Sequence, residues 1–175
     1  MWVNEPPGDS QKVWHEFIGE HFYRKTILDI GAGGAESKDR LSVGENTVTT
    51  HDINRALMDR VDLICELDKI EGTFDVVTAF DVIEHVVNCI RFMDQLFTLA
   101  TERVFITTPN RFMIPRNWHY FPKEFYGIVK WNDNLKYFLR FKGSNFDNII
   151  EVNKEDFLIN KDAWGLGLMI SKDKE

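Results

Sequence analysis

The residues best suited to chemistry lie in a glycine turn near the start of the chain. The sequence Ile27-Leu-Asp29-Ile-Gly31-Ala-Gly33 carries a short apolar run straight into a Gly-x-Gly pattern. Glycines let the backbone approach a ligand closely, and a helix that follows aims its N-terminus at that ligand. The pattern therefore predicts a nucleotide-type crevice at the carboxyl ends of parallel strands.

Two common nucleotide-binding patterns do not match this turn. The dinucleotide pattern needs a glycine three residues after Gly33, and the chain has Glu36 there, whose carboxylate would meet the pyrophosphate. No Gly-Lys-Ser or Gly-Lys-Thr sequence follows, so the Walker phosphate loop is also absent. Binding of NAD or FAD is therefore disfavoured.

The turn instead resembles the first motif of the class I S-adenosylmethionine-dependent methyltransferases, in which an acid stands two residues before Gly-x-Gly. The third glycine that is usual in that motif is Ala35 here. Nineteen residues after Gly33, the strand-like segment 47–52 ends in Asp52, which can accept hydrogen bonds from both ribose hydroxyls. An acid at one strand end means little alone, but with the glycine turn it strongly favours this family.

The resemblance extends well to residue 110 and only loosely beyond it. Cys65-Glu66-Leu67 looks like the acid that follows the family's third strand and the apolar residue beside it. Residues 72–86 look like the fourth strand and the Glu-His-Val helix start of many small-molecule methyltransferases. Residues 107–110 resemble the exit of the fifth strand, and residues 164–171 resemble the seventh strand.

The resemblance implies a fold, a cofactor and a set of site residues. The fold class is α/β, with a Rossmann-like, mostly parallel seven-stranded sheet, helices on both faces and an antiparallel C-terminal strand. The cofactor is S-adenosylmethionine and the product S-adenosylhomocysteine. Each site residue also has a plain structural interpretation, and Phe80 could equally belong to the core. The residues expected to bind the cofactor are Asp29, Gly31, Ala32, Gly33, Asp52, Ile53, Glu66, Leu67, Phe80 and Asp81.

Two histidines are the candidate catalytic bases. Methyl transfer from a sulfonium is an in-line displacement, and a hydroxyl nucleophile benefits from a base. His85 lies four residues after Asp81, so on a helix the carboxylate could orient the imidazole. The alternative is a histidine that only packs or caps a helix start. His119 is the better candidate, because a similar His-aromatic-Phe run ending in Glu lies over the substrate side in several members of the family.

A basic, aromatic segment follows the fifth predicted strand. Residues 111–142 hold seven Lys or Arg against two acids, in a chain whose net charge is −7, and ten of the 23 aromatic residues. We expect this segment to cap the acceptor and to select an anionic or aromatic small molecule. Alternatively, a helix after Pro122 packs on the sheet and its cations are only solvated. The residues expected to contact the acceptor are Arg111, Arg116, Trp118 and Tyr120.

The sequence narrows the acceptor further. The Asp/Asn-Pro-Pro-Tyr loop of DNA amino-methyltransferases and the Pro-Cys pair of cytosine carbon methyltransferases are both absent. The leading hypothesis is therefore a small-molecule methyltransferase. An RNA or other nucleic-acid methyltransferase remains an alternative, because bases stack on aromatic side chains and phosphates attract Lys and Arg. A non-catalytic cofactor-binding subunit is a second alternative.

The elements that must position these residues follow from the hydrophobic patterns. Apolar residues at helical spacing predict helices over residues 10–23, 82–100 and 122–141, with a short one over 35–42. Apolar or β-branched runs predict strands at 26–30, 47–52, 61–65, 74–80, 104–108, 148–152 and 164–171. The last two strands lack a predicted helix between them and should pair antiparallel.

Length and composition agree with one globular domain. The 175 residues, 43% hydrophobic and 28% charged, predict a single domain over 1–175. No apolar run approaches the roughly 20 residues of a membrane span, and the acidic start is unlike a secretory signal, so a cytoplasmic protein is expected. Cys65 and Cys89 are expected to be buried core thiols, and no metal site is expected. The expected parts are an N-terminal helix (10–23), a cofactor-binding core (25–110), a substrate-side cap (111–142) and closing strands (146–171).

Overall fold

The computed structural model describes residues 9–33, 36–110, 135–142 and 147–172. Short 3₁₀ turns connect several of the helices and strands of these ranges. The elements are α1 (Asp9–His21), β1 (Thr26–Ile30), α2 (Glu36–Leu41), β2 (Thr47–Asp52), β3 (Leu63–Ile64), β4 (Phe74–Phe80), α3 (Cys89–Leu99), β5 (Ala100–Pro109), β6 (Leu135–Phe141), β7 (Asn148–Val152), α5 (Lys154–Ile159) and β8 (Gly165–Ser171).

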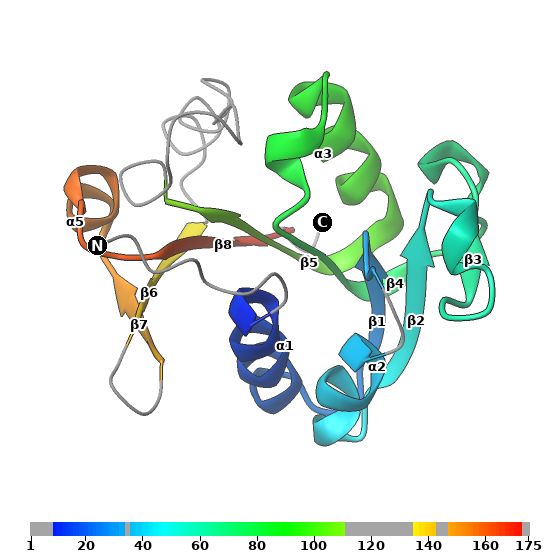
Figure 1. Ribbon diagram of the computed structural model, residues 1–175, viewed down its shortest axis with the longest axis horizontal. Helices are drawn as coiled ribbons and strands as arrows, with labels where there is room; N and C mark the ends of the chain where they lie inside the picture. The colour runs from blue at the N-terminus through cyan, green and yellow to red at the C-terminus, as the bar shows by residue number, and fades with distance from the viewer. Residues whose placement is uncertain (1–8, 34–35, 111–134, 143–146, 173–175) are drawn as a thin grey trace.

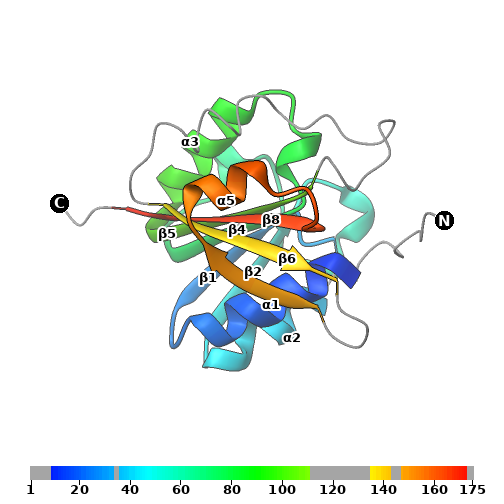
Figure 2. The ribbon, with the colours of Figure 1, turned by 90° about the vertical axis from the view of Figure 1, so that its left-hand side faces the viewer.

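All of these strands belong to one mixed sheet, which confirms the predicted α/β fold class. Their order is β3-β2-β1-β4-β5-β8-β6-β7. The five strands from β3 to β5 are parallel, whereas β8 runs antiparallel to both β5 and β6. Helices α1 and α2 cover one face of the sheet, and α3 and α5 cover the other (Figures 1 and 2). The carboxyl ends of the parallel strands therefore open at a single edge.

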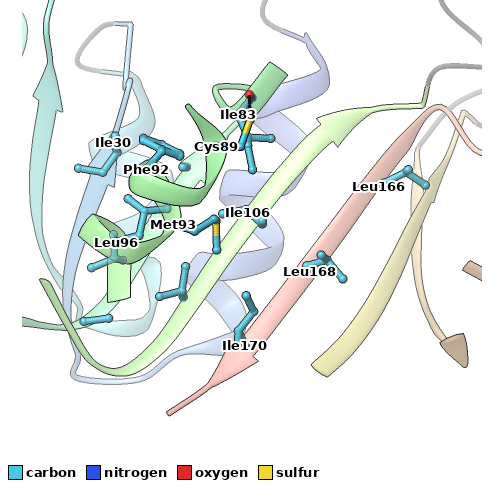
Figure 3. Close-up of a cluster of buried hydrophobic side chains, with 14 of the residues drawn as sticks. Ile30, Ile83, Cys89, Phe92, Met93, Leu96, Ile106, Leu166, Leu168 and Ile170 are labelled. Atoms are coloured by element: carbon cyan, nitrogen blue, oxygen red, sulfur yellow. Dashed lines mark hydrogen bonds between the residues drawn. The ribbon is translucent and has the colours of Figure 1, made fainter. Parts of the chain in front are cut away.

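The two sides of the parallel strands build two separate cores because neighbouring residues point to opposite faces. Toward α3, Ile30 and Ile106 of the sheet pack with Phe92 and Leu96 of the helix (Figure 3). Toward α1, the sheet contributes Ile27, Val76, Phe80 and Phe105, which pack with Trp14 and Ile18 of the helix. Burial on both faces explains why β1 and β4 read as nearly continuous apolar runs.

The antiparallel half of the sheet departs from the sequence prediction. Residues 135–141 were expected in a helix, but they form β6, so the described residues hold eight strands rather than seven. Tyr137, Phe138 and Leu139 are all buried, because β6 lies between β8 and β7 with both faces covered. A run that is apolar on both faces fits a central strand as well as a helix.

Two further expectations need correction. The last two predicted strands do not pair with each other: β7 pairs with β6, and helix α5 lies between β7 and β8 in the chain. The helix predicted for 82–100 begins only at Cys89, where the Asn88 side chain caps it by accepting a hydrogen bond from the Arg91 amide at 3.0 Å. Among the described residues, no helix is both long and apolar enough to cross a bilayer.

Candidate functional site

The glycine turn leaves β1 at the centre of the parallel strands, between β2 and β4. Gly31 and Gly33 have φ angles of 70° and 63°, in the left-handed region that favours glycine. A Cβ at Gly31 would lie 2.5 Å from the Cγ2 of Val82, so the turn and the segment after β4 are packed too closely for any side chain there. The Ala32 amide donates to the His51 carbonyl at 3.0 Å, which fastens the turn to β2.

Asp52 joins this turn to the exit of β2. Its Oδ2 accepts a hydrogen bond from the Gly33 amide at 3.1 Å, and its Oδ1 accepts one from the Asn54 amide at 2.8 Å. The two contacts fix the carboxylate at the edge of the sheet. Each carboxylate oxygen keeps a further lone pair, so Asp52 can also accept hydrogen bonds from a ligand diol.

A cavity of about 660 Å³ opens at the carboxyl ends of β1, β2 and β3, within the size range of small-molecule sites. Five of the predicted cofactor residues line it: Gly31, Asp52, Ile53, Glu66 and Leu67. The other lining residues are Ile30, His51, Cys65, Asp68, Val82, Val86, Val87, Asn88, Arg91, Phe92 and Gln95. Apolar side chains with a few polar groups among them suit a nucleoside, whose base has apolar faces and polar edges.

The cavity wall also changes the expectation for one thiol. Cys89 is buried and its Sγ lies 3.8 Å from the Ile83 carbonyl oxygen, as a core thiol should. Cys65, expected in the core as well, is only half-buried and lines the cavity. Strand β3 ends one residue before it, so Cys65 belongs to the exit segment rather than to the sheet.

Asp29 lies beneath the glycine turn and faces α1, so it does not line the cavity. Its side chain is completely buried, and its Oδ1 accepts a hydrogen bond from the Thr78 hydroxyl at 2.9 Å. Burial raises the pKa of Asp29 to about 7, although the Ser37 and Thr78 hydroxyls act in the opposite direction. The hydrogen bond to Thr78 ties β1 to β4 just before the glycine turn.

His15 of α1 is a member of this cluster that the sequence analysis missed. Its Nε2 lies 3.9 Å from Asp29 Oδ2, and its ring packs edge-on against Phe80 with a centroid distance of 4.4 Å. Burial, and then the positive charge of Arg40, lowers the pKa of His15 to about 3. The signal was available, because His15 stands in the apolar stripe of the helix beside Trp14 and Ile18.

The structure does not bring every predicted cofactor residue to the cavity. Phe80 is buried in the core toward α1, where it contacts Phe105 at a centroid distance of 5.9 Å, as its alternative interpretation as a core residue predicts. Asp81 follows β4 with a φ of 54°, a strained backbone for a residue with a side chain. Its Oδ1 accepts a hydrogen bond from the Thr107 hydroxyl at 2.9 Å, which ties the exits of β4 and β5 together.

The segment after Asp81 is not the α-helix that was expected to align it with His85. Residues Ile83–His85 form a 3₁₀ turn, so the helical spacing between Asp81 and His85 does not apply. Glu84 is buried, and burial, followed by the charge of Asp81, raises the pKa of Glu84 to about 8. The more exposed His85 has its Nε2 4.0 Å from Glu84 Oε1. Burial and the neighbouring Asp81 carboxylate therefore both favour the protonated form of Glu84.

The expected acceptor residues His119, Arg111, Arg116, Trp118 and Tyr120 lie outside the described residues. Within the described part of the chain, no group of three or more His, Cys, Asp or Glu side chains could hold a metal ion. The chemistry that the described site offers is thus the binding of a nucleoside-bearing ligand at the exits of β1 to β3, with acidic groups at the exit of β4.

Comparison with known proteins agrees with this geometry. A family model described as a methyltransferase domain matches residues 9–150. Among the curated proteins, no sequence matches the chain significantly.

Solved structures share the fold at low sequence identity. The N-methyltransferase NodS from Bradyrhizobium japonicum WM9, in complex with S-adenosylhomocysteine, has a TM-score of 0.67 at 10% identity, covering 98% of this chain and 90% of its own. A possible histamine N-methyltransferase from Thermotoga maritima has a TM-score of 0.65 at 11% identity, covering 93% and 89%. The small RNA methyltransferase HEN1 has a TM-score of 0.66 at 15% identity, covering 100% of this chain but 26% of its own. The chain belongs to the methyltransferase domain family and is an S-adenosylmethionine-dependent enzyme of the class I fold.

Proposed function

We propose that this enzyme transfers the methyl group of S-adenosylmethionine to a small-molecule acceptor. The proposal rests on how much of each structural relative's own length is matched by this chain. The N-methyltransferase NodS and the possible histamine N-methyltransferase are each matched over about nine tenths of their own length. The RNA methyltransferase HEN1 is matched over only about a quarter, so most of that protein has no counterpart in this chain.

The cofactor is proposed to bind with its adenosine in the cavity. Asp52 would accept hydrogen bonds from the ribose hydroxyls, because its two oxygens already face the turn and the β2 exit. Ile53 and Leu67 would pack on the faces of the adenine, and Glu66 would accept from its amino group. The methionine half would follow the backbone of Gly31, Ala32 and Gly33.

The transfer itself needs orientation more than covalent chemistry. The nucleophile forms a bond to the methyl carbon as the carbon–sulfur bond breaks, and the sulfur keeps the electron pair as a neutral thioether. A proton on the nucleophile passes to a base or to water. Holding both reactants in line and excluding water can lower the barrier by about 7–11 kcal/mol. We propose His119 as the base when the acceptor needs one, with His85 as the second candidate.

Two experiments test these proposals. Isothermal titration with S-adenosylmethionine and S-adenosylhomocysteine should give saturable binding; absence of heat and of thermal stabilisation, alongside stabilisation by NAD, would contradict the cofactor placement. Incubation of metabolite extracts with isotopically labelled S-adenosylmethionine, followed by mass spectrometry, should then identify a labelled small molecule that is absent without the protein.

An RNA acceptor is the second candidate. It is favoured by the likeness of the whole chain to the HEN1 domain and by the net charge of +5 in residues 111–142. Binding of single-stranded RNA would weaken steeply as salt rises, because each phosphate contact releases counterions. If the methyl label appears in RNA and not in the metabolite fraction, RNA and not a small molecule is the acceptor.

A further inference from the structure

On the β3 side of the cavity, the strand ladder is short. Strand β3 has only two residues, paired to β2 as His51 with Leu63 and Asp52 with Ile64. The next residues along the chain, Cys65 to Leu67, line the cavity and carry the proposed adenine contacts. Something other than the ladder must therefore set the direction in which this exit segment leaves the sheet.

One support lies before β3. The Asp62 carboxylate accepts hydrogen bonds from the amide and the hydroxyl of Thr50, at 2.8 and 2.9 Å, and it pairs with the Lys38 ammonium at 2.7 Å. These contacts fix where β3 begins. They do not reach the exit segment, which starts three residues later.

The second support comes from His51. Its Nε2 lies 2.8 Å from the Cys65 carbonyl oxygen, and its side chain is 3% exposed. A carbonyl oxygen only accepts, so the ring nitrogen must be the donor and the Nε2–H form is present. Because β3 ends at Ile64, the ring supplies the hydrogen bond that the ladder would give if the strand continued by one residue.

We propose that His51 is a positioning residue for cofactor binding, which holds the Cys65 carbonyl so that Glu66 and Leu67 face the adenine. This inference rests on the proposed placement of the cofactor. His51 acts through the exit segment and not through contact with the reacting atoms. Its other ring nitrogen is buried without a described partner, so the ring makes one directed contact with the protein.

A pair of substitutions separates the hydrogen bond from simple packing. In His51→Gln the amide nitrogen occupies the place of Nε2 and can donate to the Cys65 carbonyl, whereas His51→Leu fills space without a donor. We expect His51→Leu to raise the Kd for S-adenosylhomocysteine about 5- to 20-fold, and His51→Gln to stay within about 3-fold of the parent chain. Adenosine alone should lose the same factor, because it contains the whole affected half of the cofactor.

A matched control comes from the amino ends of the parallel strands, opposite the cavity. The Asp75 carboxylate accepts hydrogen bonds from the Thr26 amide and hydroxyl at 2.8 and 2.9 Å, far along the strands from the cavity. Asp75→Ala should lower the melting temperature and leave the Kd for adenosine unchanged. All titrations are made well below the lowest melting temperature of the set.

The outcomes separate this inference from the proposed function. No binding by the parent chain would contradict the cofactor placement itself. Parent-like binding by His51→Leu, or equal losses in His51→Leu and His51→Gln, would overturn the positioning role alone. Nitrogen NMR of the histidine rings in the unsubstituted protein gives a second measure that needs no variant: an Nδ1–H ring at His51 would overturn the proposal, and an Nε2–H ring would support it.

Discussion

The exits of β1 and β4 lie next to each other in the sheet but are built in opposite ways. At β1, backbone amides donate the hydrogen bonds that hold the turn: Ala32 donates to the His51 carbonyl and Gly33 donates to Asp52. At β4, side chains dominate, with Asp81 in a strained conformation and a buried Glu84 whose pKa is raised by burial and by the charge of Asp81. The backbone of residues 31–33, which we call the cofactor cradle, suits one fixed ligand, whereas titratable side chains suit a reaction. We therefore expect the first exit to set the affinity for the cofactor and the second to affect turnover.

The largest expected effect lies on the acceptor side. Replacing His119 by Ala should lower turnover by about 10²- to 10⁴-fold if it acts as a general base, with little change in the Kd for S-adenosylhomocysteine. Steady-state kinetics with the identified acceptor and titration of the product provide the two readouts.

Arg111→Ala or Arg116→Ala should mainly raise the acceptor KM if either side chain pairs with an anionic group. Unchanged kinetics in all three variants would mean that His119, Arg111 and Arg116 do not act on the acceptor.

The glycine turn should show the reverse pattern. Gly31→Ala must place a Cβ 2.5 Å from Val82 at a φ of 70°, so the turn has to leave the conformation that binds the cofactor. Restoring that conformation costs about 2–4 kcal/mol from strain and overpacking, which predicts a loss of affinity of about 100-fold. Gly72→Ala is the matched control, because Gly72 also has a positive φ but has no atom within 4 Å of the added Cβ. Equal affinities of the two variants for S-adenosylhomocysteine would show that the conformation at Gly31 does not determine cofactor binding.

These two exits also differ in how far the sequence could predict them. The Asp29 to Gly33 turn was visible because glycine spacing records backbone geometry, and Asp52, Ile53, Glu66 and Leu67 all line the cavity as expected. The geometry at the exit of β4 could not be predicted, because Asp81 and His85 were expected on one helix and the segment forms a 3₁₀ turn instead.

Burial from elsewhere in the chain explains the remaining differences. Phe80 was placed at the site, but it is buried against Phe105 and α1, which only the packed sheet shows. The ionisation of Asp29 and Glu84 depends on burial by residues distant in sequence, which no local pattern records. Strand β6 was mistaken for a helix for a similar reason, since β7 and β8 flank it on both sides.

Asp52 offers a smaller test of the cradle. Asp52→Ala removes the acceptor for the Gly33 and Asn54 amides and the proposed partner of the ribose hydroxyls. Losing charge-assisted hydrogen bonds costs about 1.5–3 kcal/mol, so the Kd for S-adenosylhomocysteine should rise tens-fold while the fold persists. Circular dichroism checks the fold and calorimetry gives the Kd. An affinity close to that of the unsubstituted chain would mean that the end of β2 does not hold the ribose.

The smallest expected effect concerns how stability depends on pH. The folded-state pKa of Asp29 is raised from 3.8 to about 7 and that of Glu84 from 4.5 to about 8, so both groups bind more protons when folded, and their contribution is lost as pH rises. The pKa of His15 is lowered from 6.5 to about 3, so its contribution is lost as pH falls below 6.5. The opposing slopes of His15 and Asp29 largely cancel between about pH 4.5 and 6.5. Between about pH 6.5 and 8 the folded-state titrations of Asp29 and Glu84 continue, and His15 no longer opposes them.

The chain should therefore lose stability between pH 6 and pH 8, by about 1–3 kcal/mol in the free energy of unfolding, since one group can contribute about 1.4 kcal/mol per pH unit. Urea unfolding at the two pH values measures the loss. Glu84→Gln keeps the shape of the side chain but cannot ionise, so this variant should be less sensitive to pH over the same interval. If Gln at this position left the pH dependence unchanged, Glu84 would not be the buried acid of the β4 exit. If Glu84→Gln reduces the pH dependence of stability and leaves the affinity for S-adenosylhomocysteine unchanged, the Glu84 proton belongs to the acceptor side of the site and not to the cofactor cradle.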